Sequence, residues 1–178
     1  LGAELLGVRL NILAIYGTLP SQETTYHSYF VVRKEDLIRS AQYKPETGEP
    51  TLEHIEKYLR ALKQNPARFI YHDRFSTSSY FLPALYFKTH DVFAMRQSIN
   101  PNLTPIQVDR LLSTSSTDLV YQIADKKADL AAVWDGTKKK FTEATTDPTK
   151  VDANSKVSFI PIPTDVPNDF LVASGLRP

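Results

Sequence analysis

Short runs of hydrophobic residues, separated by polar stretches, divide the chain into alternating strands and helices. Runs that are apolar, aromatic or β-branched over a few consecutive positions are typical of buried strands. This pattern predicts strands at residues 12–16, 26–33, 67–71, 108–112, 130–134 and 157–160. Residues 34–36 are polar and are expected to end the second strand, and the mostly polar residues 136–155 receive no element from the pattern.

Helical spacing of apolar residues predicts three helices between these strands. The first is capped by Thr51 and stopped by Pro66, and Leu52, Ile55, Leu59 and Leu62 lie on one face. The second begins near Ser79 or Tyr80, because Pro83 is tolerated only in the first turn of a helix. The third carries Leu119, Val120, Ile123 and Ala124. Alternating strands and helices predict an α/β fold in which helices pack on a sheet.

Composition narrows the class of protein further. The chain has 178 residues, 42% of them apolar and 23% charged, which fits one globular domain or two small lobes. Its net charge of +1 argues against a nucleic-acid binder, and the basic run at residues 138–140 is expected to be a solvated loop. Cysteine is absent, which excludes disulfides, thiol nucleophiles and zinc–thiolate sites.

Two features of the sequence concern membranes and processing. The longest apolar stretch, residues 80–87, contains a proline and is far shorter than a membrane span, so none is expected in this chain. No signal peptide is present, and the chain opens with Leu1 in place of Met. We therefore expect a processed chain or an excised fragment.

Two hydroxyl-rich loops are the main candidates for ligand binding. Residues 76–79 and 113–117 each follow a predicted strand and enter a predicted helix. A helix N-terminus presents unpaired N–H groups and a partial positive charge, and hydroxyls add donors, so such loops bind phosphate, sulfate or carboxylate. In an open α/β sheet they lie where ligands gather, at the carboxyl ends of strands. Plain N-capping is the alternative interpretation of both loops.

Other residues are weaker candidates, and each has a structural alternative. Tyr26, Tyr29 and Tyr80 could donate a phenol hydrogen bond or simply pack. Asp135 directly follows Trp134 at the end of a predicted strand, where it could hold an amine or hydroxyl of a ligand or cap a turn. Common enzyme motifs are missing, and no metal site, cofactor or catalytic residue is assigned. A Ser/His/Asp set made from Ser76, His72 and Asp73 is disfavoured, because triads are usually assembled from distant segments.

Four segments, in order, resemble the phosphate/phosphonate-type periplasmic substrate-binding proteins of ABC transporters. Tyr26-His27-Ser28 followed by Val31-Val32-Arg33-Lys34 is similar to the hinge-and-strand segment of that family. Residues 76–83 resemble its Ser-Thr-Ser-Gly signature with an apolar run and a proline. Residues 128–133 and 167–172 resemble, respectively, a strand of the second lobe and the strand that returns to the first.

The resemblance implies a type II periplasmic-binding-protein fold, in which two α/β lobes close on a ligand. Residues 25–156 would form the second lobe, with a mixed sheet flanked by helices. Residues 1–24 and 157–178 would be parts of the first lobe, most of which is absent from this chain.

The resemblance also implies a function and a set of ligand-binding residues. Tyr26, Ser76, Thr77 and Ser78 match the family's oxyanion-binding hinge tyrosine and Ser-Thr-Ser loop. The glycine after that loop is Ser79 here, and a histidine that often opens the next helix is replaced by Ser116 or Thr117, which puts phosphonate specificity in doubt. The expected function is a non-enzymatic, extracytoplasmic or periplasmic domain that binds a small oxyanion or anionic metabolite and delivers it to an ABC transporter permease. A sensor module of the same fold and, from another class, a small serine hydrolase are the alternatives.

Overall fold

The structure, a computed structural model, describes residues 10–15, 25–62, 67–73, 75–89, 115–143, 146–167 and 170–174. The strand predicted at 108–112 and the hydroxyls of Ser113 and Thr114 lie outside the described residues. The chain divides into two compact units, Leu1–Tyr26 with Asp165–Pro178, and His27–Thr164. The assignment of the chain to parts of two lobes stays a prediction.

The smaller unit contains an antiparallel pair of strands, β1 (Leu10–Ile15) and β6 (Phe170–Ser174). Leu10 lies opposite Ser174 and Ile15 opposite Phe170, with an irregularity in register between Ile12 and Ala14. The strand predicted near the N-terminus is confirmed, with bounds shifted by one or two residues. Its partner comes from the other end of the sequence.

A mixed four-stranded sheet in the order β3-β4-β2-β5 organises the larger unit. Its strands are β2 (Thr25–Arg33), β3 (Phe69–Ile70), β4 (Leu130–Trp134) and β5 (Val157–Pro167). β3 runs parallel to β4, and β2 runs antiparallel to it. All four strands were predicted, but β5 continues past its predicted end through Pro161 and Pro163. Because β5 lies at the sheet edge, prolines do not interrupt a ladder on both sides.

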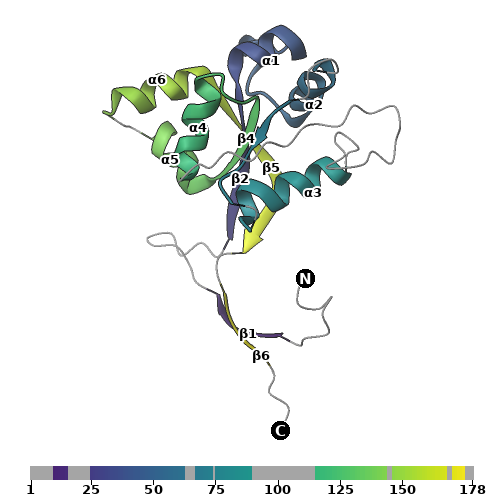
Figure 1. The fold of residues 1–178 in the computed structure, drawn as a ribbon, viewed down its shortest axis with the longest axis vertical. Coiled ribbons are helices and arrows are strands. Elements are labelled where there is room, and N and C mark those ends of the chain that lie inside the picture. The colour runs from purple at the N-terminus through teal and green to yellow at the C-terminus, as the bar shows by residue number, and fades with distance from the viewer. Residues whose placement is uncertain are drawn as a thin grey trace. The chain divides into compact units, whose positions relative to one another are not determined.

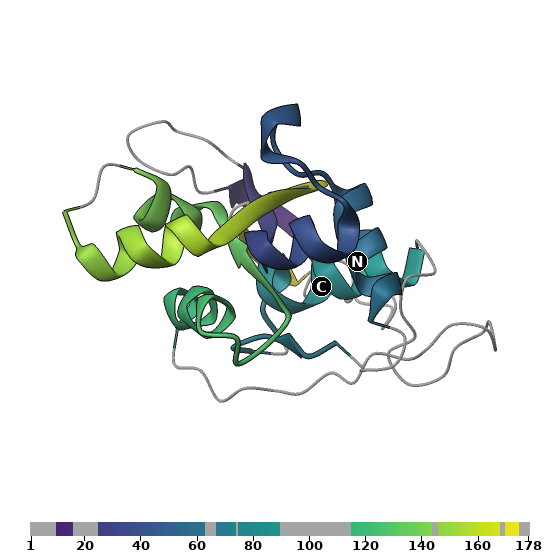
Figure 2. The same ribbon diagram turned by 90° about the horizontal axis from the view of Figure 1, so that it is seen from above.

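Helices cover both faces of this sheet (Figures 1 and 2). The alternation of side chains along β2 sets the two layers. Phe30 and Val32 belong to a core cluster shared with α1 (Lys34–Ala41), α2 (Leu52–Ala61) and α3 (Leu82–Thr89). Val31 belongs to a second cluster shared with α4 (Ser116–Ala124), α5 (Asp135–Thr142) and α6 (Pro148–Lys156). The expected α/β fold, with a mixed sheet flanked by helices, is confirmed.

Several predicted details are wrong, each for a physical reason. Residues 34–36 end β2, as predicted, but they also begin α1, whose acidic first turn complements the helix dipole. Residues 138–140 lie in α5, not in a loop, because Phe141 and Thr137 bury one face of that otherwise polar helix. Pro83 does lie in the first turn of α3, but a π-helical turn, η3 (Thr77–Phe81), precedes it, so the helical segment starts earlier than predicted.

Candidate functional site

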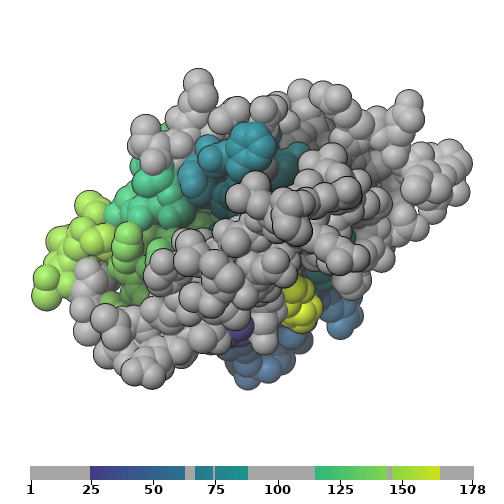
Figure 3. Space-filling view, turned by 90° about the horizontal axis from the view of Figure 1, so that it is seen from below, coloured from purple at the N-terminus to yellow at the C-terminus, as the bar shows by residue number. Residues whose placement is uncertain are grey.

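One edge of the sheet gathers most of the candidate residues. Because β3 and β4 are parallel, their carboxyl ends meet at this edge, and η3 and α5 follow them. β2 runs the opposite way, and Ser28 near its start pairs with Trp134, the last residue of β4. We call this place the Ser28 edge. Atoms of the teal segment that carries η3 and of the green segment that carries α4 reach the surface on the same face in Figure 3.

Hydrogen bonds hold the serines of η3 in place. The Ser76 hydroxyl accepts from the Ser79 N–H at 3.2 Å and so caps the turn. The buried Ser28 hydroxyl donates to the carbonyl of Ser78 at 2.7 Å. Ser79 itself is buried, and its hydroxyl lies 3.1 Å from His72 Nδ1.

The hydroxyls of Thr77 and Ser78 have no hydrogen bond to the described part of the chain; Thr77 is half-buried, and the buried Ser78 is engaged through its backbone carbonyl. The first N–H groups of a helix have no acceptor within that helix, so the amides of Thr77 and Ser78 are also open to a ligand. The turn is therefore held by Ser76, by Ser79 and through the Ser78 carbonyl, and it leaves the Thr77 and Ser78 hydroxyls and its first amides available. This is the geometry expected of an anion-binding loop.

The start of α4 repeats this arrangement. The Ser115 hydroxyl accepts from the Asp118 N–H at 3.3 Å and caps the helix. The Ser116 hydroxyl lies 2.6 Å from that of Thr137, a fully buried residue in the first turn of α5, so the two helix starts are joined. Thr117 is half-buried, and its hydroxyl makes no hydrogen bond within the described ranges.

Asp135 brings a negative charge to the Ser28 edge. It is the first residue of α5, its side chain is 17% exposed, and Oδ2 accepts from the His27 N–H at 3.4 Å. Burial, and then the charge of Asp135, raise the pKa of Tyr29, which keeps that phenol protonated as a donor. Lys138 Nζ lies 4.2 Å from the centre of the Tyr29 ring. A carboxylate here disfavours an anion beside α5 and suits an amine or hydroxyl.

The sequence also raised expectations for Tyr26 and for a Ser76, His72 and Asp73 set. Tyr26 is half-buried near the start of β2 and belongs to the smaller unit. The pairing that the hydrolase hypothesis needs, between His72 and Ser76, is not formed. His72 contacts Ser79, and Asp73 Oδ1 accepts from the Phe75 N–H at 2.9 Å.

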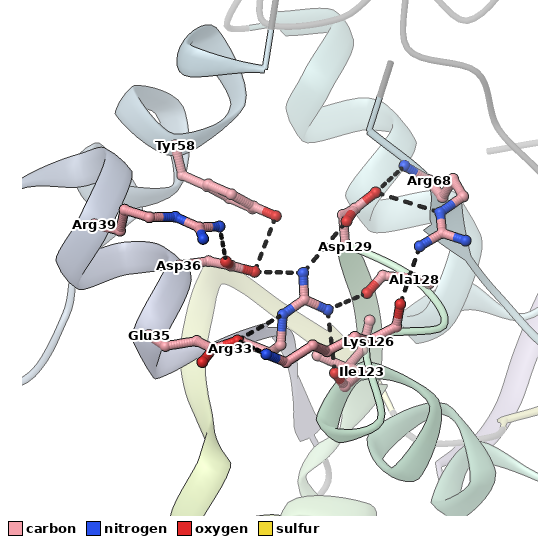
Figure 4. Close-up of polar contacts among 10 residues, drawn as sticks. All are labelled: Arg33, Glu35, Asp36, Arg39, Tyr58, Arg68, Ile123, Lys126, Ala128 and Asp129. Carbon is pink, nitrogen blue, oxygen red and sulfur yellow. Dashed lines mark hydrogen bonds and ion pairs between the residues drawn. The ribbon is translucent and has the colours of Figure 1, made fainter. Parts of the chain in front are cut away.

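Sequence reasoning missed the most highly connected polar residue of the larger unit, Arg33 (Figure 4). Arg33 ends β2, and its side chain is 8% exposed. One terminal nitrogen donates to the carbonyls of Ile123 at 3.2 Å and Ala128 at 2.5 Å. The other pairs with Asp36 and donates to Asp129 at 3.3 Å. We call the surroundings of this side chain the Arg33 end of the sheet.

The two carboxylates around Arg33 have further partners. Asp36 accepts from Arg39 at 2.7 Å and from the Tyr58 hydroxyl at 3.4 Å. Asp129 accepts from the backbone N–H of Arg68 at 2.8 Å. Burial by itself would lower the pKa of Arg33, but Asp36 and the hydrogen bonds outweigh it and raise that pKa. Arg33 stays charged and joins helices α1 and α4 to the strands.

Within the described ranges, no group of three or more His, Asp or Glu side chains is arranged to hold a metal ion. No helix in the described part of the chain is long and apolar enough to cross a membrane.

Comparison with known proteins finds similarity to solved structures. No family model matches the chain, and no curated protein matches it. A solved structure from Pseudomonas aeruginosa, a binding protein component of an ABC phosphonate transporter, aligns with a TM-score of 0.51 and 19% identity. The alignment covers 96% of this chain and 45% of that one, so the chain spans less than half of its length. This chain shares a binding-protein fold. At this identity the likeness shows the fold alone.

Proposed function

We propose that the chain is a solute-binding domain for a small oxyanion or an anionic metabolite, phosphate or phosphonate in type. The observation that supports this most directly is the open Thr77 hydroxyl at the start of a helical turn that hydrogen bonds of Ser28, Ser76 and Ser79 hold in place. The start of α4 adds Thr117, and the fold is one that a transport binding protein also has.

The proposed ligand has two kinds of polar group. Its anionic oxygens accept from Thr77, from Thr117 and from the first amides of η3, while Ser76 and Ser78 shape the turn. An amine or hydroxyl of the ligand meets Asp135. Tyr26 completes the set as the resemblance implies. Binding, not catalysis, is the role that we propose for this set.

We extend the proposal to the partner of the protein and to its cellular compartment. An ABC transporter permease would receive the solute, and the compartment would be periplasmic or otherwise extracytoplasmic. Both statements rest on the resemblance and on the similarity in fold to a binding protein component of an ABC phosphonate transporter.

Calorimetric titration of exhaustively dialysed protein tests the proposal. The panel is phosphate, phosphite, sulfate, short phosphonates and anionic metabolites. We expect saturable binding of at least one of them, and Thr77→Val should lose about 1.5–3 kcal/mol of affinity because a charge-assisted hydrogen bond disappears. Thr142→Val is the matched control, since Thr142 is exposed at the far end of α5. Absence of heat with the whole panel, or equal losses in both variants, would contradict the assigned site.

A further inference from the structure

A cavity of about 550 Å³ lies at the Arg33 end, which is at the other end of β2 from the Ser28 edge. Arg33 lies five residue steps after Ser28 along the strand, which corresponds to roughly 17 Å. The cavity lies between the start of α1, the end of α4 and the end of α6, and its volume is in the range of small-molecule sites. Its walls include Arg33, Lys34, Lys126 and Lys156, together with the carboxylates of Glu35 and Asp125.

The buried guanidinium of Arg33 has one unused donor in this wall. Its Nε atom is buried and has no hydrogen-bond partner in the structure, although the terminal nitrogens are fully engaged. Buried donors of this kind are rare in folded proteins. Glu35 Oε1 lies 4.0 Å from Nε, which is too far for a hydrogen bond.

Glu35 marks the position that an anionic oxygen takes between two cations. Its Oε1 lies 2.7 Å from Lys126 Nζ and faces Arg33 Nε (Figure 4). The Glu35 side chain is 54% exposed, and such exposed ion pairs are weak, so it can leave this position. A free carboxylate, unlike Glu35, is not held back by its own backbone and can reach Nε.

The rest of the wall fits an organic anion. Lys34 Nζ donates to the carbonyl of Asn154 at 3.1 Å and has no carboxylate partner within the described ranges, so its charge is not neutralised. Lys156 Nζ contacts Asp152 through one bond and keeps other donors. The exposed side chain of Ile38 and the side chain of Ala124 add an apolar surface.

We propose that this cavity binds a small organic acid with more than one carboxylate. One carboxylate displaces Glu35, bridges Lys126 Nζ and Arg33 Nε, and leaves Lys34 and Lys156 for the others. The carbon skeleton lies against Ile38 and Ala124. This site is separate from the proposed solute site, and neither proposal depends on the other.

Titration with citrate tests the site, with two substitutions that act in opposite directions. Lys126→Gln should weaken citrate binding about tenfold, because it removes a charge-assisted contact. Glu35→Gln should strengthen it a few-fold, because it removes the internal competitor. A role of Glu35 in folding alone would not tighten a ligand. Lys139→Gln, at an exposed lysine on α5, is the matched control and should bind like the unaltered protein.

Nitrogen-15 NMR of the same titration reports on the contact itself. The Arg33 Nε–H resonance should move downfield as citrate binds, and trimethyl citrate, which lacks the charges, should leave it in place. Absence of citrate binding to both the unaltered protein and Glu35→Gln would overturn the proposal. So would citrate binding that Thr77→Val weakens and Lys126→Gln does not, because citrate would then occupy the Ser28 edge.

Discussion

The two ends of β2 hold their polar groups by different means. At the Ser28 edge, hydrogen bonds of the Ser28, Ser76 and Ser79 hydroxyls hold η3, and the hydroxyls of Thr77 and Thr117 stay open. At the Arg33 end, a buried cation is surrounded by two carboxylates and two carbonyls, and one donor, Nε, is left over. A single neutral hydrogen bond contributes little to stability, whereas a buried charge without a partner destabilises the fold strongly.

This difference separates the parts of the molecule that tolerate change from those that do not. A loop held by neutral hydroxyl bonds can lose one donor and still fold, which leaves its chemistry free to suit a ligand. The Arg33 end joins α1, α4 and the strands through charge, so its first role is to hold the larger unit together. We expect substitutions at the two ends to affect different measurements, namely ligand affinity at one and stability at the other.

Asp36→Ala should give the largest effect on stability. It removes the carboxylate that pairs with Arg33 and accepts from Arg39 and Tyr58, and leaves a buried cation only partly compensated. Breaking a buried ion pair in this way costs about 3–5 kcal/mol. Urea unfolding followed by circular dichroism measures the loss.

The matched control for that experiment is Asp152→Ala. Asp152 also pairs with a lysine, Lys156, at 2.6 Å, but its side chain is 61% exposed. Its removal should change the unfolding midpoint little, because exposed ion pairs are screened by water. A midpoint shift of similar size in both variants would show that Arg33 is as well solvated as a surface residue.

The sheet could be predicted from the sequence because its strands carry their own signal. Phe30, Val31 and Val32 are buried on both faces, and residues 130–134 form a strand with the predicted bounds. Helices α5 and α6 could not be predicted, because each buries little apolar surface. Phe141 and Ala153 are too few to give the helical spacing of apolar residues. The polar stretch contains helices α5 and α6 because tertiary packing, not local pattern, decides their formation.

The candidate site was predictable only in part, for a related reason. The Ser76–Ser79 loop could be found by composition, and it does begin a helical turn. That Ser28 holds Ser78, or that Asp135 meets His27, depends on contacts between distant segments. Arg33 gave no signal, since an arginine at the end of a strand is usually solvated, and only the fold brings Asp129 to it.

Ser28→Ala should have a smaller effect on stability than Asp36→Ala. It leaves the carbonyl of the buried Ser78 without its donor, which costs about 1–3 kcal/mol. Thermal unfolding of the variant measures this loss.

Ser155→Ala is a close match for that substitution. Its hydroxyl also donates to a backbone carbonyl at 2.7 Å, that of Asp152, but the residue is exposed. Water replaces the lost bond there, so the unfolding temperature should hardly change. If the two variants were equally stable, the Ser28 edge would not depend on this hydrogen bond, and the contrast with the Arg33 end would be sharper still.

Tyr58→Phe removes the 3.4 Å hydrogen bond to Asp36 at every pH, and its pH-dependent effect, the smallest of those predicted, appears only at alkaline pH. Burial, followed by the charges of Asp36 and Asp129, raises the pKa of Tyr58 above its ordinary 10.0. Above pH 10 the unfolded chain therefore loses this proton before the folded one does, so the folded state is disfavoured as the pH rises. Between pH 10 and pH 11 the difference amounts to roughly 1 kcal/mol.

Urea unfolding between pH 7 and pH 11 checks this expectation. The curves of free energy of unfolding against pH should run parallel below pH 9, where Tyr58 is protonated in both states. Above pH 10 the unaltered protein should lose stability more steeply than Tyr58→Phe, since the other tyrosines titrate in both. Equal slopes would mean that Tyr58 ionises as freely in the folded chain as in the unfolded one. Water would then reach Asp36 and its partners, and the Arg33 end would be no drier than the Ser28 edge.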